Sequence, residues 1–105
     1  MLKRWREYSS IVARAAKNIL GDKLESIYVV GGVAENRITV YSDIDIVVVV
    51  RDPGLKSIDI VLDIMVEAGR LGLPLEAPID LKINTVEEFR ENLGKLYKRA
   101  VKIEP

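Results

Sequence analysis

Two aspartates, Asp43 and Asp45, stand one residue apart at the start of a very hydrophobic segment. The residues that follow, 46–50, are one isoleucine and four valines, which is typical of a strand buried on both faces of a sheet. Side chains alternate faces along a strand, so both carboxylates project to the same side, about 7 Å apart. Adjacent anions beside a core repel each other and lose hydration, and a divalent cation usually offsets that cost. The pair therefore predicts a metal site.

A third carboxylate, Asp80, lies in the alternating segment 79–83, which predicts another strand. If the strands that carry Asp45 and Asp80 are neighbours, three carboxylates converge on one place. That arrangement serves two-metal phosphoryl or nucleotidyl transfer, in which ions about 4 Å apart hold the attacking and leaving oxygens. The third carboxylate is then the natural base for an incoming hydroxyl. The alternative role for Asp80 is an ion pair with Lys82, which shares its face.

A glycine pair, Gly31 and Gly32, follows the short apolar segment 27–30, which we expect to be a buried strand. Without Cβ atoms, backbone N–H groups there can approach a phosphate closely. Taken alone, the glycines are more simply a turn, and Asp-x-Asp can equally well be solvated charge at the end of a strand. The ordered set of Gly-Gly, nine further residues, Ser42-Asp43-Ile44-Asp45 and a third strand aspartate is far more specific than any of its parts.

The composition limits the chemistry that the chain can use. It has 105 residues, of which 49% are hydrophobic and 30% charged, and sixteen basic residues balance sixteen acidic ones. These values predict a single globular domain over residues 1–105. With no net positive charge, the chain lacks the overall electrostatic attraction that binding a nucleic-acid backbone requires. Cysteine and histidine are absent, which excludes disulfides, Cys/His zinc sites and thiol or imidazole catalysis. Because no apolar run matches a membrane span or a signal peptide, we expect a cytoplasmic protein.

Apolar periodicity and turn residues predict the elements that position these groups. Three helices are expected, over residues 2–20, 57–71 and 86–100. Three strands are expected, over residues 27–30, 43–51 and 79–83. The last helix should begin with a capping box formed by Thr85 and Glu88. This order of elements predicts a small α/β domain with a helix-covered sheet.

The residues Val30-Gly31-Gly32, the spacer and Ser42-Asp43-Ile44-Asp45-Ile46 resemble the signature of the DNA polymerase beta-like nucleotidyltransferase superfamily. The chain length most resembles that of its minimal nucleotidyltransferases, and the resemblance covers nearly the whole chain. It implies the palm fold of polymerase beta, a small mixed sheet flanked by helices, with a nucleoside triphosphate as substrate and Mg²⁺ or Mn²⁺ as cofactor. The resemblance also implies that Asp43, Asp45 and Asp80 are the catalytic, metal-binding residues. It places Gly31, Gly32 and Ser42 beside the triphosphate.

The chain also departs from the pattern of the minimal members. Many of them carry basic residues just after the glycine pair, whereas this chain has Val33, Ala34 and Glu35. Arg37 is the candidate substitute for binding the triphosphate. These departures leave the metal site intact and bear on nucleotide affinity and the choice of base.

Together, the residues and the resemblance predict a Mg²⁺-dependent nucleotidyltransferase that moves AMP from ATP to a hydroxyl. A domain this small has little left to build an acceptor pocket, so we expect a partner to supply the acceptor. Minimal nucleotidyltransferases that resemble this chain are often antitoxins that adenylylate a helical HEPN-domain toxin. The wide apolar surface of helix 57–71, including Ile60 and Ile64, suits such a partner or a homodimer.

The alternative is a non-catalytic module of the same fold that binds nucleotide or protein and acts by occluding its partner. The departures at Val33 and Glu35 favour this alternative, and the complete set of three aspartates favours the enzyme. Nucleotide binding that disappears in Asp45→Asn would separate the two. The neutral charge and the small size disfavour an RNA-tailing role.

Overall fold

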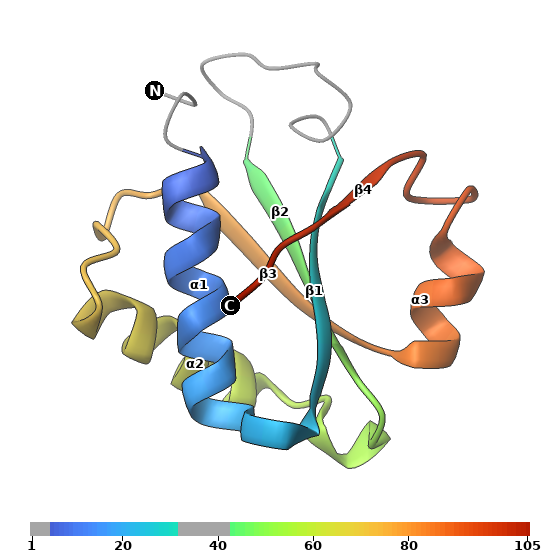
Figure 1. The fold of residues 1–105 in the computed structure, drawn as a ribbon, viewed down its shortest axis with the longest axis horizontal. Helices are drawn as coiled ribbons and strands as arrows, with labels where there is room; N and C mark the ends of the chain where they lie inside the picture. Colours follow the sequence, from blue (N-terminus) through green and yellow to red (C-terminus); the bar gives the residue numbers. More distant parts are fainter. Residues whose placement is uncertain (1–4, 32–42) are drawn as a thin grey trace.

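The computed structural model of the protein describes residues 5–31 and 43–105, which form a four-stranded sheet and three α-helices (Figure 1). The helices are α1 (Trp5–Leu20), α2 (Ile58–Arg70) and α3 (Val86–Asn92). The strands are β1 (Leu24–Val30), β2 (Ile44–Val50), β3 (Ile79–Thr85) and β4 (Ala100–Lys102). Short 3₁₀ turns, η2 (Gly21–Lys23) and η3 (Pro53–Leu55), precede β1 and α2.

The sheet is mixed, with the strand order β3-β2-β1-β4. β2 and β3 are parallel, and β1 is antiparallel to both β2 and β4. A parallel pair needs a crossover connection, which α2 supplies here. The predicted mixed sheet flanked by helices is therefore confirmed. The second and third strands, whose adjacency was the condition for bringing the aspartates together, are neighbours.

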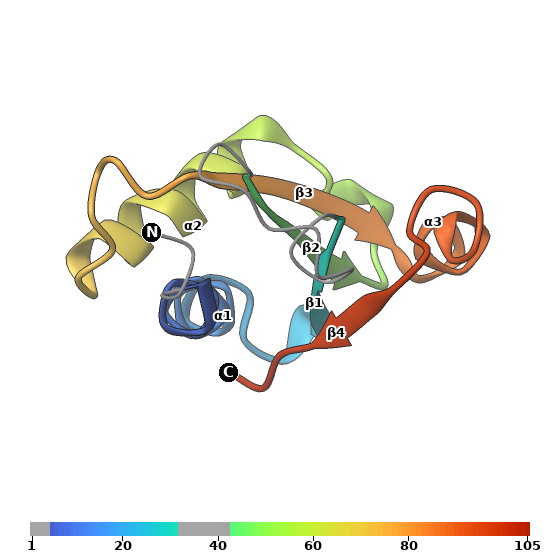
Figure 2. The same cartoon turned by 90° about the horizontal axis from the view of Figure 1, so that it is seen from above.

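The sheet separates α1 and α2 on one side from α3 on the other (Figure 2). Alternate residues of β1 and β2, including Ile27, Ile46 and Val48, pack with α1 and α2 in the main core. The intervening residues Val30, Val47 and Val49 form a smaller cluster with Phe89 of α3. The valine run of β2 is thus buried on both faces, as its sequence predicts.

Side-chain caps fix the starts of α2 and α3. Ser57 accepts a hydrogen bond from the backbone N–H of Ile60 at 3.2 Å and caps α2. At α3, the Thr85 hydroxyl accepts from the Glu88 backbone N–H, and the Glu88 carboxylate accepts from the Thr85 backbone N–H at 2.8 Å. The predicted capping box is confirmed, and it joins α3 directly to the end of β3.

The C-terminal part of the sequence prediction is wrong. The last helix ends at Asn92, and Gly94 adopts a left-handed backbone conformation (φ 84°) that turns the chain away. The Gly94 N–H donates to the Tyr97 carbonyl, and Ala100 begins β4. Tyr97 and Ala100 therefore do not belong to the predicted helix. A glycine just past a helix end is a common stop signal, which explains the early termination.

The interpretation of Ile60 and Ile64 as surplus apolar surface on α2 is also wrong. Ile64 is fully buried in the main core, and Ile60 is partly buried against it. The exposed apolar side chains of this helix are instead Ile58 (67% exposed), Leu62 (54%) and Val66 (67%). Separately, no helix within residues 5–31 and 43–105 combines the length and apolar character that crossing a bilayer requires.

Candidate active site

The parallel pairing of β2 and β3 brings two of the predicted site residues together. Asp45 lies directly opposite Asp80 in the strand register, and each is the second residue of its strand. Asp43 immediately precedes β2 and belongs to the same alternating face as Asp45. All three aspartates therefore lie at the end of the sheet where β2 and β3 begin. The sequence interpretation placed Asp80 in the middle of its strand, which is wrong: β3 extends to Thr85, so Asp80 lies near its start.

The end of β1 supplies the other side of this edge. Val30, its last residue, is the register partner of Asp45, and Gly31 follows in a left-handed conformation (φ 77°). A Cβ atom at Gly31 would lie only 2.3 Å from Oδ2 of Asp45. Glycine is required here for both the backbone conformation and the space, because any side chain would displace the carboxylate. The glycine in the motif thus fixes where the Asp45 carboxylate can lie.

The environment of Asp45 favours its protonated form. Burial raises the pKa of Asp45 above its ordinary value, and Coulombic repulsion from Asp80 and a side-chain hydrogen bond that protonated Asp45 donates to Asp80 raise it further. The negative charge of Asp43 acts in the same direction, and the positive charge of Lys82 opposes these effects. Unfavourable ionisation of this kind is concentrated at functional sites, because binding a cation relieves it.

Lys82 forms an ion pair with Asp80, which lies two residues earlier on the same face of β3. Its Nζ lies 2.8 Å from Oδ2 of Asp80, and both side chains are about half exposed. This hydrogen bond is the main reason that the pKa of Lys82 is raised, with further contributions from the charges of Asp80 and Asp45. The ion pair predicted as the alternative role of Asp80 is therefore present, in addition to the pairing with Asp45.

Two of the aspartates are close together, and the third stands further out. Within residues 5–31 and 43–105, no three acidic side chains are near enough to one another to form a ready-made cation cluster. Asp43 is exposed and acts on Asp45 through its charge. The donor set still fits a hard divalent cation, because it consists of carboxylate oxygens whose mutual repulsion a cation removes. Asp45 and Asp80 would hold such an ion, with Asp43 completing the set.

Several predicted site residues lie outside the described residues. These are Gly32, Arg37 and Ser42, together with the departures Val33, Ala34 and Glu35. The described part of the site therefore consists of Gly31, Asp43, Asp45, Asp80 and Lys82. The roles assigned to the other residues stay predictions.

Sequence reasoning missed how the same face continues toward α3. Asn84 follows Asp80 and Lys82 on alternate positions of β3, and its Oδ1 accepts a hydrogen bond from Nδ2 of Asn92 at 3.2 Å. Tyr97 lies near enough to contribute to the raised pKa of Lys82. The period of two from Asp80 through Asn84 is the sequence signal that could have linked these residues to the site.

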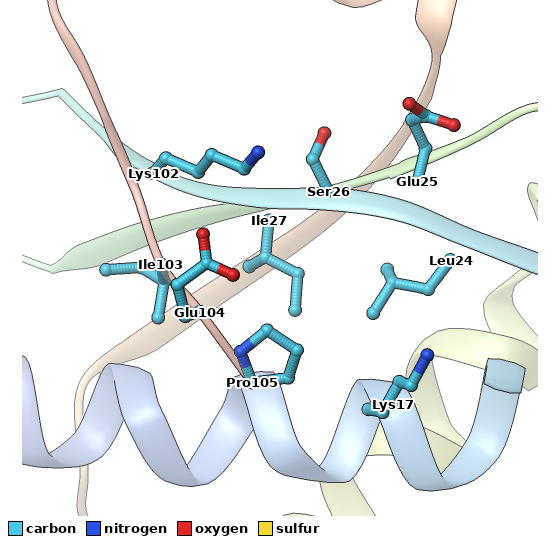
Figure 3. Close-up of a pocket in the computed structure, with 9 residues that line it drawn as sticks. All are labelled: Lys17, Leu24, Glu25, Ser26, Ile27, Lys102, Ile103, Glu104 and Pro105. Atoms are coloured by element: carbon cyan, nitrogen blue, oxygen red, sulfur yellow. The ribbon is translucent and has the colours of Figure 1, made fainter. Parts of the chain in front are cut away.

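A separate cavity lies away from the aspartates. It has a volume of about 160 Å³ between α1, β1 and the C-terminal segment, where Leu24 and Ile27 face Pro105 (Figure 3). Positively charged lysines and negatively charged glutamates line it, and none of the three aspartates does. The cavity therefore does not compete with the β2–β3 edge as the candidate active site.

The candidate site thus combines a mixed sheet, a parallel pair of strands that presents opposed aspartates, and a close-packed glycine at the end of β1. Residues 10–104 match the sequence model of the family described as "Nucleotidyltransferase domain". Because that match spans most of the chain, the protein belongs to the nucleotidyltransferase domain family. No protein with a curated function matches the chain.

Two solved structures share the fold. One is a provisionally named nucleotidyltransferase from Sulfolobus solfataricus, with a TM-score of 0.56 and 20% identity over 96% of this chain and 83% of its own. The other, also provisionally named a nucleotidyltransferase, has a TM-score of 0.58 and 18% identity over 87% of this chain and 91% of its own. At these identities the likeness concerns the fold alone. It agrees with the family assignment made from the sequence.

Proposed function

We propose that the protein is a Mg²⁺-dependent nucleotidyltransferase that transfers the AMP moiety of ATP to a hydroxyl acceptor on a partner protein, breaking the bond between the α- and β-phosphates and releasing pyrophosphate. The observation that carries the proposal is the register of β2 and β3, which sets Asp45 opposite Asp80 beside Gly31. When bound, a divalent cation neutralises these carboxylates and attracts triphosphate oxygens. Membership of the nucleotidyltransferase domain family supports the transfer of a nucleotide. The metal, the base and the acceptor belong to the proposal.

Each described residue has a role in this reaction. Gly31 lets the chain pass close to Asp45, so the backbone after β1 can reach a phosphate near the carboxylates. Asp45 and Asp80 would hold the cation beside the triphosphate, with Asp43 completing the set. Asp80 also takes the proton of the acceptor hydroxyl in this proposal, which its position opposite Asp45 in the strand register supports. Mn²⁺ can replace Mg²⁺, because both cations prefer oxygen ligands.

The acceptor is proposed to come from another protein because the site is open. The three aspartates lie at the end of the sheet where β2 and β3 begin. Asp43 is exposed to solvent, and the Asp80 side chain is about half exposed. Exposed Ile58, Leu62 and Val66 recur every four residues along α2, a spacing that suits a helical partner. A helical protein of the HEPN type is the proposed partner, as in antitoxins that adenylylate their toxins. A homodimer through the same helix is the competing use of that surface.

Thermal unfolding with and without Mg²⁺-ATP tests the nucleotide site directly. Ligand at about 100 times its Kd should stabilise the wild type by about 2.7 kcal/mol, or about 10 °C or more in Tm. Asp45→Asn should lose that shift, whereas Asp63→Asn, an exposed acid on α2, should keep it. Transfer of labelled AMP from ATP to the helical partner should likewise fall at least 100-fold in Asp45→Asn. Equal shifts in all three proteins would contradict the proposed site.

The second candidate function is a non-catalytic binding module of the same fold. The Lys82–Asp80 ion pair favours it, because one carboxylate of the site is already neutralised by the protein itself. Such a module would bind its partner equally well as wild type and as Asp45→Asn. Partner binding without ATP-dependent labelling, in both proteins, would select this function over the enzyme.

A further inference from the structure

One positive charge stands among the carboxylates of the candidate site. Lys82 comes from the same strand as Asp80, two residues later, and therefore projects from the same face. Its Nζ lies 2.8 Å from Oδ2 of Asp80. Asp80 is in turn the register partner of Asp45, so the ammonium stands beside the pair of aspartates that the two strands set opposite each other.

The same carboxylate oxygen cannot serve Lys82 and a cation equally well. A divalent ion that used Oδ2 of Asp80 would be within a few ångströms of the ammonium, where two positive charges repel strongly. The Lys82 side chain is 51% exposed, so solvent is available to receive the ammonium if it leaves. A lysine side chain is long and flexible, so its ammonium can move into solvent without disturbing the packing of its neighbours.

We propose that Lys82 is the internal counter-ion of the metal-free site, and that a divalent cation displaces its ammonium from Asp80. Lys82 then sets how tightly the site takes a metal, and it acts as a positioning residue for Asp80. The inference rests on the proposed function, because it assumes that Asp43, Asp45 and Asp80 hold the cation. With Lys82 in place, three carboxylates are opposed by one charge, and without it they attract a cation more strongly.

Mn²⁺ binding without nucleotide, followed by electron paramagnetic resonance of the free ion at low ionic strength, tests the proposal. Lys82→Met keeps the length of the side chain and removes its charge, so it should bind Mn²⁺ roughly threefold to tenfold more tightly than wild type. Lys82→Arg keeps the charge and should restore an affinity near that of wild type. Lys102→Met removes an exposed charge from β4, at the opposite edge of the sheet, and should leave the affinity unchanged.

The Asp80→Asn background shows whether Lys82 acts through Asp80. Without that carboxylate, adding Lys82→Met should produce no further gain in Mn²⁺ affinity. A gain of the same size in that background, or in Lys102→Met, would overturn the proposal in favour of a general charge effect. Circular dichroism of each variant checks that the fold is retained.

The failures of this inference and of the proposed function are distinguishable. If wild type binds Mn²⁺ and Lys82→Met binds it equally or less tightly, the counter-ion role is overturned and the metal site stands. If neither wild type nor any variant binds Mn²⁺ at millimolar concentration, the proposed cation site fails, and the role of Lys82 fails with it.

Discussion

The two faces of β2 show how one short strand serves two different purposes. Ile44, Ile46 and Val48 face α1 and α2 and are fully buried in the main core. On the opposite face, a charged residue, Asp45, is followed directly by a buried apolar residue, Val47. The first face is uniform and stabilises the fold. The second face places a destabilising carboxylate against that rigid support, which holds the candidate site in position.

The largest stability effect is expected on the uniform face. Ile46→Ala should lower the free energy of unfolding by about 3 kcal/mol, because the fully buried side chain leaves a cavity between the sheet and its helices. Urea unfolding measures the loss, and Mn²⁺ affinity of the folded protein should stay within about twofold. Val66→Ala, at an exposed position of α2, should change stability by less than about 0.5 kcal/mol. A loss of Mn²⁺ binding in Ile46→Ala would show that the two faces are not independent.

The next effect separates backbone strain from the contact with Asp45. Gly31→Ala should cost about 2 kcal/mol and abolish Mn²⁺ binding, because its Cβ would displace the Asp45 carboxylate. Gly94 has a similar φ of 84° with open space around it, so Gly94→Ala should cost only the strain, about 1 kcal/mol. Thermal unfolding and Mn²⁺ titration of both variants make the comparison. Intact Mn²⁺ binding in Gly31→Ala would contradict the close packing of Gly31 on Asp45.

A third prediction concerns the cost of ionising Asp45. Its pKa in the folded state is raised above the ordinary 3.8, mainly by burial, so folding favours the protonated form. The stability from this proton is fully present below the unfolded-state pKa and is lost as pH rises through the folded-state pKa. Asp45→Asn should therefore stabilise the metal-free protein at pH 7 by up to about 1 kcal/mol after solvent screening, and by less at pH 3.

Thermal unfolding of Asp45→Asn at both pH values, with the metal chelated, measures this difference. Asp63→Asn serves as the exposed control and should show little change at either pH. An Asp45→Asn variant that is less stable than wild type at pH 7 would mean that the ionised carboxylate helps the fold. The contrast between the two faces of β2 would then disappear.

The smallest effect tests whether polar groups are unfavourable wherever they lack a function. The Ser9 hydroxyl in α1 is fully buried and has no hydrogen-bond partner within the part of the chain that the structure describes. Ser9→Ala should stabilise the protein by about 1 kcal/mol, through removal of the unpaired hydroxyl and the better helix propensity of alanine. Ser10→Ala, at the exposed neighbouring position, isolates the propensity contribution. Equal gains in both variants would mean that the buried hydroxyl costs nothing.

Elements with strong local signals could be predicted from the sequence. The helix predicted over residues 57–71 is α2 (Ile58–Arg70), and the Thr85–Glu88 capping box is present as expected. The valine run predicted β2. The sequence made the meeting of Asp45 and Asp80 depend on their strands being neighbours, and the structure supplies that pairing. In these regions periodicity, caps and tertiary packing agree, which makes local rules reliable.

Features that depend on tertiary contacts could not be predicted in the same way. β4 is three residues long, and pairing with β1 gives it an extended conformation that its own sequence does not specify. Leu93 and Leu96 are exposed, although their spacing imitates the apolar face of a helix. At the site, side-chain alternation predicted that Lys82 shares the face of Asp80. Its position among two carboxylates depends on the register of β2 with β3, which only the structure provides.

The parallel pairing of β2 and β3 also decides when the site comes into existence during folding. The whole of α2 and its connections lie between Asp45 and Asp80, so a long loop must close before the two carboxylates meet. Pairings of this kind lower folding rates relative to local hairpins. Until that loop closes, Asp45 and Asp80 are apart, so the electrostatic cost of bringing them together arises only when β2 and β3 pair.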